Sequence, residues 1–217
     1  MPSLPRRLAA EFLGTALLLA IVVGSGIMAE RLAGGNVALA LLANTAATGA
    51  GLVALIFAFG SISASFNPVV TLVDVLSGTR TKRDLPLYAA VQCAGALAGV
   101  LVAHVMFELP AFAASHHART GIAQWVAEAV ATFGLILTIH GTSRRAATYV
   151  PFAVGAYITA AYWFTSSTSF ANPAVTIARA CTDTFAGIAP AHIAGFVVAQ
   201  LVGAIAGWAV ARWMFTE

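Results

Sequence analysis

The sequence predicts an all-α membrane protein with six transmembrane helices and two re-entrant half-helices in an inverted repeat. Three observations predict this fold: the composition, apolar segments of two distinct lengths, and a repeated set of motifs. Of the 217 residues, 60% are hydrophobic and 9% charged, whereas soluble domains are about 45–50% apolar and about 25% charged. This composition excludes a soluble enzyme. The net charge of +3 is too small to indicate nucleic-acid binding.

Six long apolar runs are the expected spans, because each is close to the roughly 20 residues that cross a bilayer. A signal peptide is the alternative for the first run, which follows Arg6 and Arg7. That run is too long for one and contains Glu11, so we expect a retained span. The six expected spans are 8–29, 37–59, 85–107, 121–139, 146–164 and 189–211.

Two shorter apolar segments, 66–76 and 170–181, are each about half a span long. Each contains an Asn-Pro pair, at Asn67-Pro68 and Asn172-Pro173. Proline is favoured in the first turn of a helix and asparagine at the N-cap before it. The two pairs therefore predict two short helices that begin at these positions.

The basic residues predict the orientation. Eight of the eleven Lys and Arg residues fall on one side of the expected topology. Cytoplasmic loops carry the excess of Lys and Arg, so we expect both termini in the cytoplasm, as an even number of spans requires. The eight residues are Arg6, Arg7, Arg80, Lys82, Arg83, Arg144, Arg145 and Arg212.

Three motifs occur twice in the same order, which indicates an internal repeat. AEFLGT at 10–15 matches AEAVAT at 127–132, NPVVT at 67–71 matches NPAVT at 172–176, and QCAGALAG at 92–99 matches QLVGAIAG at 200–207. Repeat one covers about 8–107 and repeat two about 121–214, within a single channel domain, 1–217. Each repeat has three full spans, so the second copy must be inverted, an architecture typical of transport proteins.

Inversion brings the two half-helices in from opposite faces, with their N-termini meeting at the midplane. Each N-terminus carries about half a positive charge, and two of them facing one pore oppose the passage of cations. Asn67 and Asn172 would donate hydrogen bonds to a passing solute.

Glu11 and Glu128 are ionisable residues inside spans. They are either proton sites or structural acceptors for backbone N–H groups of the re-entrant loops, and their equivalent positions in the two repeats favour the structural role. No catalytic set or metal-ligand spacing is found.

The paired boxes Asn67-Pro68-Val69 and Asn172-Pro173-Ala174, with a glutamate in spans one and four, resemble the aquaporin, or major intrinsic protein, family. The resemblance covers nearly the whole chain. It implies an aquaporin-like fold, a homotetramer with one pore in each subunit, and passive flow of water or small neutral solutes without a cofactor. Val69 departs from the usual alanine, which we expect to be a mild change. We expect a protein integral to the bacterial inner membrane, with the lipid bilayer as its surroundings.

The resemblance also implies a selectivity filter. The family's second box is normally followed by arginine, and here that position is Val175. The other filter positions, placed by spacing from the boxes, are Thr48, Ala160 with Thr159 as the alternative, and Ser169. Such a filter is small and uncharged. Arg179, one helical turn beyond Val175, either rims the outer vestibule or only holds the half-helix.

A wide, neutral filter predicts passage of glycerol, urea or metalloid hydroxides such as arsenous acid, and of water. In having valine in place of the filter arginine, the chain resembles a bacterial branch of aquaglyceroporins associated with arsenic resistance. This resemblance implies that methylated arsenicals are also solutes. Two alternatives remain open: a plain water channel, and a proton-coupled secondary transporter that uses Glu11 and Glu128.

Overall fold

A computed structural model describes residues 2–215, and these form helices and loops without a β-strand. Residues 1 and 216–217 of the expected domain lie outside this range. Five segments are long and apolar enough to cross a membrane, and one of these, Ile122–Phe164, contains two helices joined by a short 3-10 turn. The fold is therefore all-helical and membrane-spanning, as predicted. The long helices are α1 (Leu4–Leu32), α2 (Val37–Phe59), α4 (Asp84–Met106), α5 (Ile122–Ala146), α6 (Val150–Phe164) and α8 (Ile193–Phe215).

The two short helices are α3 (Pro68–Leu76) and α7 (Pro173–Arg179). Both begin at the proline of an Asn-Pro pair, and the asparagine is the N-cap in each. The Asn67 side chain accepts a hydrogen bond from the backbone N–H of Val69, and Asn172 accepts from Ala174 and Val175. Both helices therefore start where proline and N-cap preferences predict.

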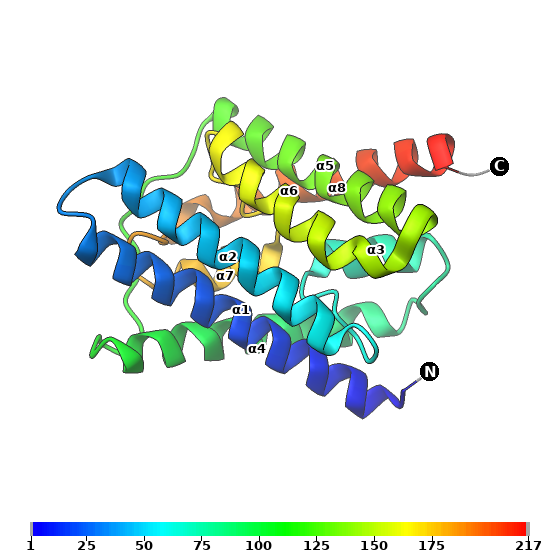
Figure 1. The fold of residues 1–217 in the computed structure, drawn as a ribbon, viewed down its shortest axis with the longest axis horizontal. Coiled ribbons are helices and arrows are strands. Elements are labelled where there is room, and N and C mark those ends of the chain that lie inside the picture. Colours follow the sequence, from blue (N-terminus) through cyan, green and yellow to red (C-terminus); the bar gives the residue numbers. More distant parts are fainter. Residues whose placement is uncertain (1, 216–217) are drawn as a thin grey trace.

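The helices pack in two matching groups. Helix α1 packs on α4 and on α2, and α5 packs on α8 and on α6. The N-terminus, the C-terminus and the loop after α3 lie at the same end of the bundle (Figure 1). We call this the terminal end. Helix α3 lies toward the terminal end, and α7 lies toward the opposite end.

Several boundaries differ from the sequence-based expectation. Helix α5 continues to Ala146, about two turns beyond the expected end at residue 139, and α6 starts at Val150. The two are separated only by a 3-10 turn, Ala147–Tyr149. Basic side chains near a helix C-terminus stabilise the helix by interacting with its dipole. Arg144 and Arg145 lie in the last turn of α5. The helix therefore extends past the end of the apolar run and includes both arginines.

Glycines allow the closest helix contacts. A side-chain carbon at Gly95 or Gly99 of α4 would collide with the carbonyl oxygens of Phe12 and Ala16 on α1. Gly203 and Gly207 of α8 face α5 in the same way. Two glycines spaced four residues apart thus allow close packing in each pair, as such motifs do in membranes. One pair joins α4 to α1 and the other joins α8 to α5.

We expect Gly99→Leu to lower stability by about 1–3 kcal/mol, the usual cost of overpacking. A carbon added there would lie 2.8 Å from the Cβ of Leu19 as well as colliding with Ala16. Thermal unfolding in detergent would measure the effect. Ala94→Leu is the matched control, because Ala94 is exposed on the same helix. Equal melting temperatures for the two variants would contradict the packing role.

Candidate functional site

The two Asn-Pro boxes are joined by reciprocal hydrogen bonds. The Nδ2 of Asn67 donates to the carbonyl oxygen of Ala171 at 2.8 Å, and the Nδ2 of Asn172 donates to the carbonyl oxygen of Phe66 at 2.8 Å. Each asparagine also caps its own half-helix through Oδ1. Because a primary amide has two N–H groups, one N–H on each side chain is left without a partner among the described residues.

The accepting carbonyls belong to residues with unusual backbone geometry. Phe66 has a φ of 49° and Ala171 a φ of 47°, both in the left-handed region that non-glycine residues rarely adopt. Each of these residues directly precedes a box asparagine. The left-handed turn directs the carbonyl toward the opposite box while the following residue begins the half-helix. Such strain persists only where surrounding contacts hold it.

Glu11 holds the first of these turns. Its carboxylate accepts from the backbone N–H groups of Ser65 at 2.9 Å and Phe66 at 2.7 Å. It also accepts from the Ser63 hydroxyl at 2.6 Å and from Nε2 of Gln92 at 2.8 Å. Glu11 is fully buried, so these four donors take the place of water around the carboxylate.

Glu128 does the same for the second turn. It accepts from the backbone N–H groups of Phe170 at 2.8 Å and Ala171 at 2.9 Å, and from Nε2 of Gln200 at 2.6 Å. Gln200 bridges onward to the Thr176 hydroxyl at 2.9 Å, as Gln92 bridges to Thr71 at 3.0 Å. In each repeat, the glutamate, the Asn-Pro box and the glutamine of the three repeated motifs are therefore linked by hydrogen bonds.

A cavity of about 940 Å³ runs beside the boxes. Its wall includes both box asparagines, and neither Glu11 nor Glu128 belongs to it. Much of the wall is apolar, with Leu18, Val22, Leu52, Ile56, Leu135, Val154 and Ile158. The two asparagines thus supply polar groups along an otherwise apolar stretch.

Of the expected filter residues, Thr48 and Val175 line this cavity. Tyr162 lines it with them, and its hydroxyl is 3.5 Å from the Thr48 hydroxyl, a long contact for a hydrogen bond. Phe170 is another aromatic residue that lines the cavity. Tyr162 and Phe170 are thus aromatic residues of the cavity wall that the expected filter does not include, and position 175 of this wall is a valine.

Ala160 does not take the place expected for it. It is exposed, on a stripe of α6 that also presents Phe152 and Trp163. The residues of α6 that line the cavity are Val150, Pro151, Val154, Ile158 and Tyr162. From Pro151 onward they are three to four residues apart, which marks one helix face. The distance in sequence from the second box predicts a filter residue at Ala160. The helical period of α6 instead places Tyr162 on the face that lines the cavity. Thr159, the alternative, is not on this face, and its hydroxyl donates to the carbonyl of Gly155.

Ser169 is buried behind the wall and does not line the cavity. Its backbone has a φ of 49°, its N–H donates to the Ser167 hydroxyl at 3.2 Å, and its own Oγ has no partner among the described residues. The loop turns left-handed at both Thr168 and Ser169. A count of residues cannot show where such a turn directs a side chain.

Arg179 is also buried, so the expectation that it rims an open vestibule is wrong. Its Nε donates to the carbonyl of Ala186, and its guanidinium lies 3.4 Å from the centroid of the Phe170 ring. Arg119, from the loop before α5, lies 5.2 Å from the same ring and donates to the carbonyls of Gly187 and Ser167. Burial lowers the pKa of Arg119. The two arginines therefore hold Phe170 and the loop around α7 in place, which is the second alternative for Arg179.

Two half-helices that meet at Asn-Pro boxes inside a spanning bundle define a membrane channel. A model of the family described as "Major intrinsic protein" matches residues 2–169. The chain is 56% identical over 212 residues to "Aquaglyceroporin AqpS" of Rhizobium meliloti, covering 97% of this chain and 91% of that protein. The chain belongs to the major intrinsic protein family.

Other relatives are more distant. "Aquaporin A" of Dictyostelium discoideum is 34% identical over 180 residues, covering 75% of this chain and 63% of that protein. The crystal structure of the aquaglyceroporin from Plasmodium falciparum superposes with a TM-score of 0.72 at 17% identity, covering 97% of this chain and 95% of that one. This likeness shows the same fold.

Replacing Glu11 by alanine would leave the N–H groups of Ser65 and Phe66 unpaired, at about 1–3 kcal/mol for each orphaned donor. Glu11→Gln keeps one acceptor oxygen, so we expect a smaller loss in melting temperature and in water permeability. Glu30→Ala is the control, because Glu30 is exposed on the same helix. Equal damage from Gln and Ala, with flux that follows a pH gradient, would instead support a proton site.

Replacing Tyr162 by alanine removes a ring from the cavity wall. We expect permeability to glycerol to rise relative to permeability to water, because the wall widens beside Thr48. Ala160→Leu changes a side chain on the exposed face and should leave the ratio unchanged. Stopped-flow measurements on proteoliposomes would compare the two. If the glycerol-to-water permeability ratio changes in Ala160→Leu and not in Tyr162→Ala, the filter residue is Ala160, as the spacing from the box predicts.

Proposed function

We propose that the cavity is the pore of a passive channel that conducts water and small uncharged solutes such as glycerol, with urea and metalloid hydroxides in the same size class. One observation carries the proposal: the cavity wall holds both box asparagines and, at position 175, a valine. The 56% identity to a protein named as an aquaglyceroporin supports the solute class. The protein acts as a channel and not as an enzyme.

Each box offers a passing solute one free amide N–H, held in place by the reciprocal bonds to Phe66 and Ala171. The positive N-terminal ends of α3 and α7 meet at the same level, and positive helix ends oppose protons and other cations. The pore therefore favours neutral molecules that accept a hydrogen bond. Thr48, Tyr162, Phe170 and Val175, which also line the cavity, carry no charge, so they do not select for charged solutes.

The contacts of the two glutamates argue against proton coupling. Glu11 and Glu128 are fully buried and absent from the cavity wall, and each carboxylate accepts hydrogen bonds from backbone N–H groups and a glutamine. A proton relay needs a carboxylate that a proton can reach. Their contacts support the role of structural acceptors that hold the two turns.

The basic residues support an inner-membrane protein with the terminal end in the cytoplasm, by the positive-inside rule. Arg80, Lys82 and Arg83 follow α3, and Figure 1 places that loop at the same end as both termini. The family supports a homotetramer with one pore in each subunit. Many large apolar side chains remain exposed on the outside of the bundle, among them Trp163 and Phe164, and lipid or neighbouring subunits would cover them.

We expect Val175→Arg to reduce glycerol flux far more than water flux. A long cationic side chain would fill part of the pore beside Tyr162, and a charge facing a confined space acts more strongly than one in water. Val175→Leu, which is larger but neutral, separates the steric part from the electrostatic part. If the glycerol-to-water ratio does not fall in Val175→Arg, residue 175 is not at the constriction.

A further inference from the structure

We propose that Arg80 and Asp74 form a second solute-selecting site, at the terminal end of the pore, which binds uncharged solutes bearing hydroxyl or amide groups. The guanidinium would donate to the solute and the carboxylate would accept from it. The proposal rests on the proposed function, because it assigns these residues to the mouth of the same pore.

The distribution of polar groups along the cavity points to this end. Between the mouth and the filter the wall is mostly apolar, apart from the two asparagines. A hydrated polar solute that enters this stretch must give up hydrogen bonds to water, which is costly unless other partners replace them. The mouth gathers these partners, namely Ser61, Ser63, Ser65, Asp74, Thr79, Arg80 and Thr148.

Arg80 and Asp74 are only partly engaged with each other. The Nε of Arg80 lies 3.3 Å from Oδ2 of Asp74, and Nη2 donates to the Ser65 hydroxyl at 3.4 Å. No hydrogen bond among the described residues reaches Nη1 of Arg80 or Oδ1 of Asp74. An arginine has five N–H donors and a carboxylate about four acceptor positions. The pair therefore keeps donors and an acceptor free on a cavity wall, with its side chains 15% and 32% exposed.

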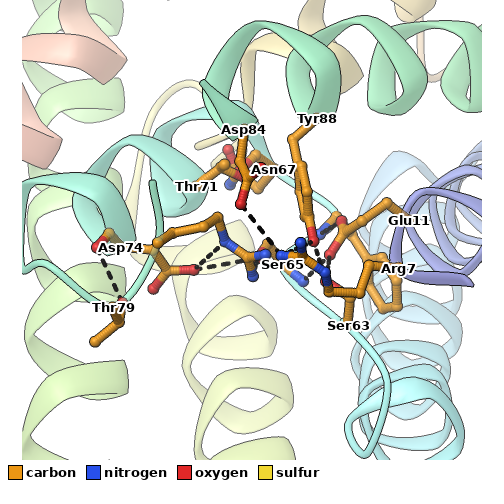
Figure 2. Close-up of polar contacts among 12 residues, drawn as sticks. Arg7, Glu11, Ser63, Ser65, Asn67, Thr71, Asp74, Thr79, Asp84 and Tyr88 are labelled. Atoms are coloured by element: carbon orange, nitrogen blue, oxygen red, sulfur yellow. Dashed lines mark hydrogen bonds and ion pairs between the residues drawn. The ribbon is translucent and has the colours of Figure 1, made fainter. Parts of the chain in front are cut away.

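Contacts with Tyr88, Asp74 and Ser65 position the arginine. The Arg80 guanidinium lies 4.1 Å from the ring centroid of Tyr88, which is fully buried. The Tyr88 hydroxyl is 3.3 Å from both Nη1 of Arg7 and the Ser63 hydroxyl, and Ser63 donates to Glu11. Figure 2 shows this series of contacts, from Asp74 and Ser65 past Tyr88 to Ser63 and Glu11. The mouth is thus anchored to the carboxylate that shapes the first box, and a fixed site loses little entropy on binding.

Each charged side chain that lines the cavity, namely Arg7, Asp74 and Arg80, is in an ion pair, which suits neutral solutes. Arg80 pairs with Asp74, and Arg7 pairs with Asp84 at 3.2 Å. Asp74 lies near the C-terminal end of α3, where a carboxylate is electrostatically unfavourable for the helix. Helix stability alone therefore does not account for an acid at this position, whereas a site that needs an acceptor beside a donor does.

The test is stopped-flow permeability of proteoliposomes to glycerol, urea and water, for Arg80→Met, Arg80→Lys and Asp74→Asn. Methionine keeps an unbranched apolar chain but removes every donor. We expect Arg80→Met to lower the glycerol-to-water and urea-to-water ratios about fivefold to tenfold, the rate equivalent of one hydrogen bond. Arg80→Lys, which keeps a charged donor, should lose less. Arg31→Met is the matched control, because Arg31 also lies over an aromatic ring, that of Phe107, but outside the cavity wall.

Water permeability serves as the measure of a folded channel in each variant. If Arg80→Met abolishes water flux as well, Asp74→Asn decides: we expect its glycerol-to-water ratio to fall about twofold to threefold. Unchanged or increased ratios in the folded variants would overturn the proposal and leave the pair as a structural contact. Failure of the proposed function is distinct, since the wild-type protein would then conduct neither water nor glycerol above empty liposomes.

Discussion

Non-helical backbone in the membrane interior needs a hydrogen-bond partner for every N–H and C=O, and the rest of this structure depends on how that requirement is met. The turns before α3 and α7 expose such backbone. Glu11 and Glu128 take up the N–H groups on one side of each turn, and the box asparagines take up the carbonyls of Phe66 and Ala171 on the other. Each repeat therefore completes the hydrogen bonding of the other, and neither half-helix is held by its own repeat alone.

This arrangement leaves the pore with few polar groups. The carboxylates are used behind the wall, so the midplane offers amide N–H groups and positive helix ends. Thr48, Tyr162, Phe170 and Val175 line the cavity without adding a charged side chain, and the ion-paired Arg80 and Asp74 line it as well. Among the described residues, the charged side chains on the cavity wall are Arg7, Asp74 and Arg80, and each takes part in an ion pair.

The architecture could be predicted from the sequence because its signals are local or repeated. Span length, the Asn-Pro caps and the duplicated motifs each follow from short-range chemistry, and the all-helical spanning fold is as expected. Side-chain direction was harder to predict. Counting from the box predicts Ala160, but the helical phase of α6 brings Tyr162 to the cavity, and the left-handed backbone at Thr168 and Ser169 accompanies a Ser169 that does not line it. Arg179 lies under a loop whose packing on Phe170 depends on long-range contacts that no local pattern encodes.

The central claim is that this chain is a passive pore wide enough for a polyol. Its most direct test is the permeability of proteoliposomes containing the wild-type protein, measured over a series of glycerol gradients with and without a pH gradient. We expect glycerol flux well above that of empty liposomes, proportional to the gradient, with a low activation energy and no response to pH. Flux that saturates and follows the proton gradient, or water flux without glycerol flux, would contradict it.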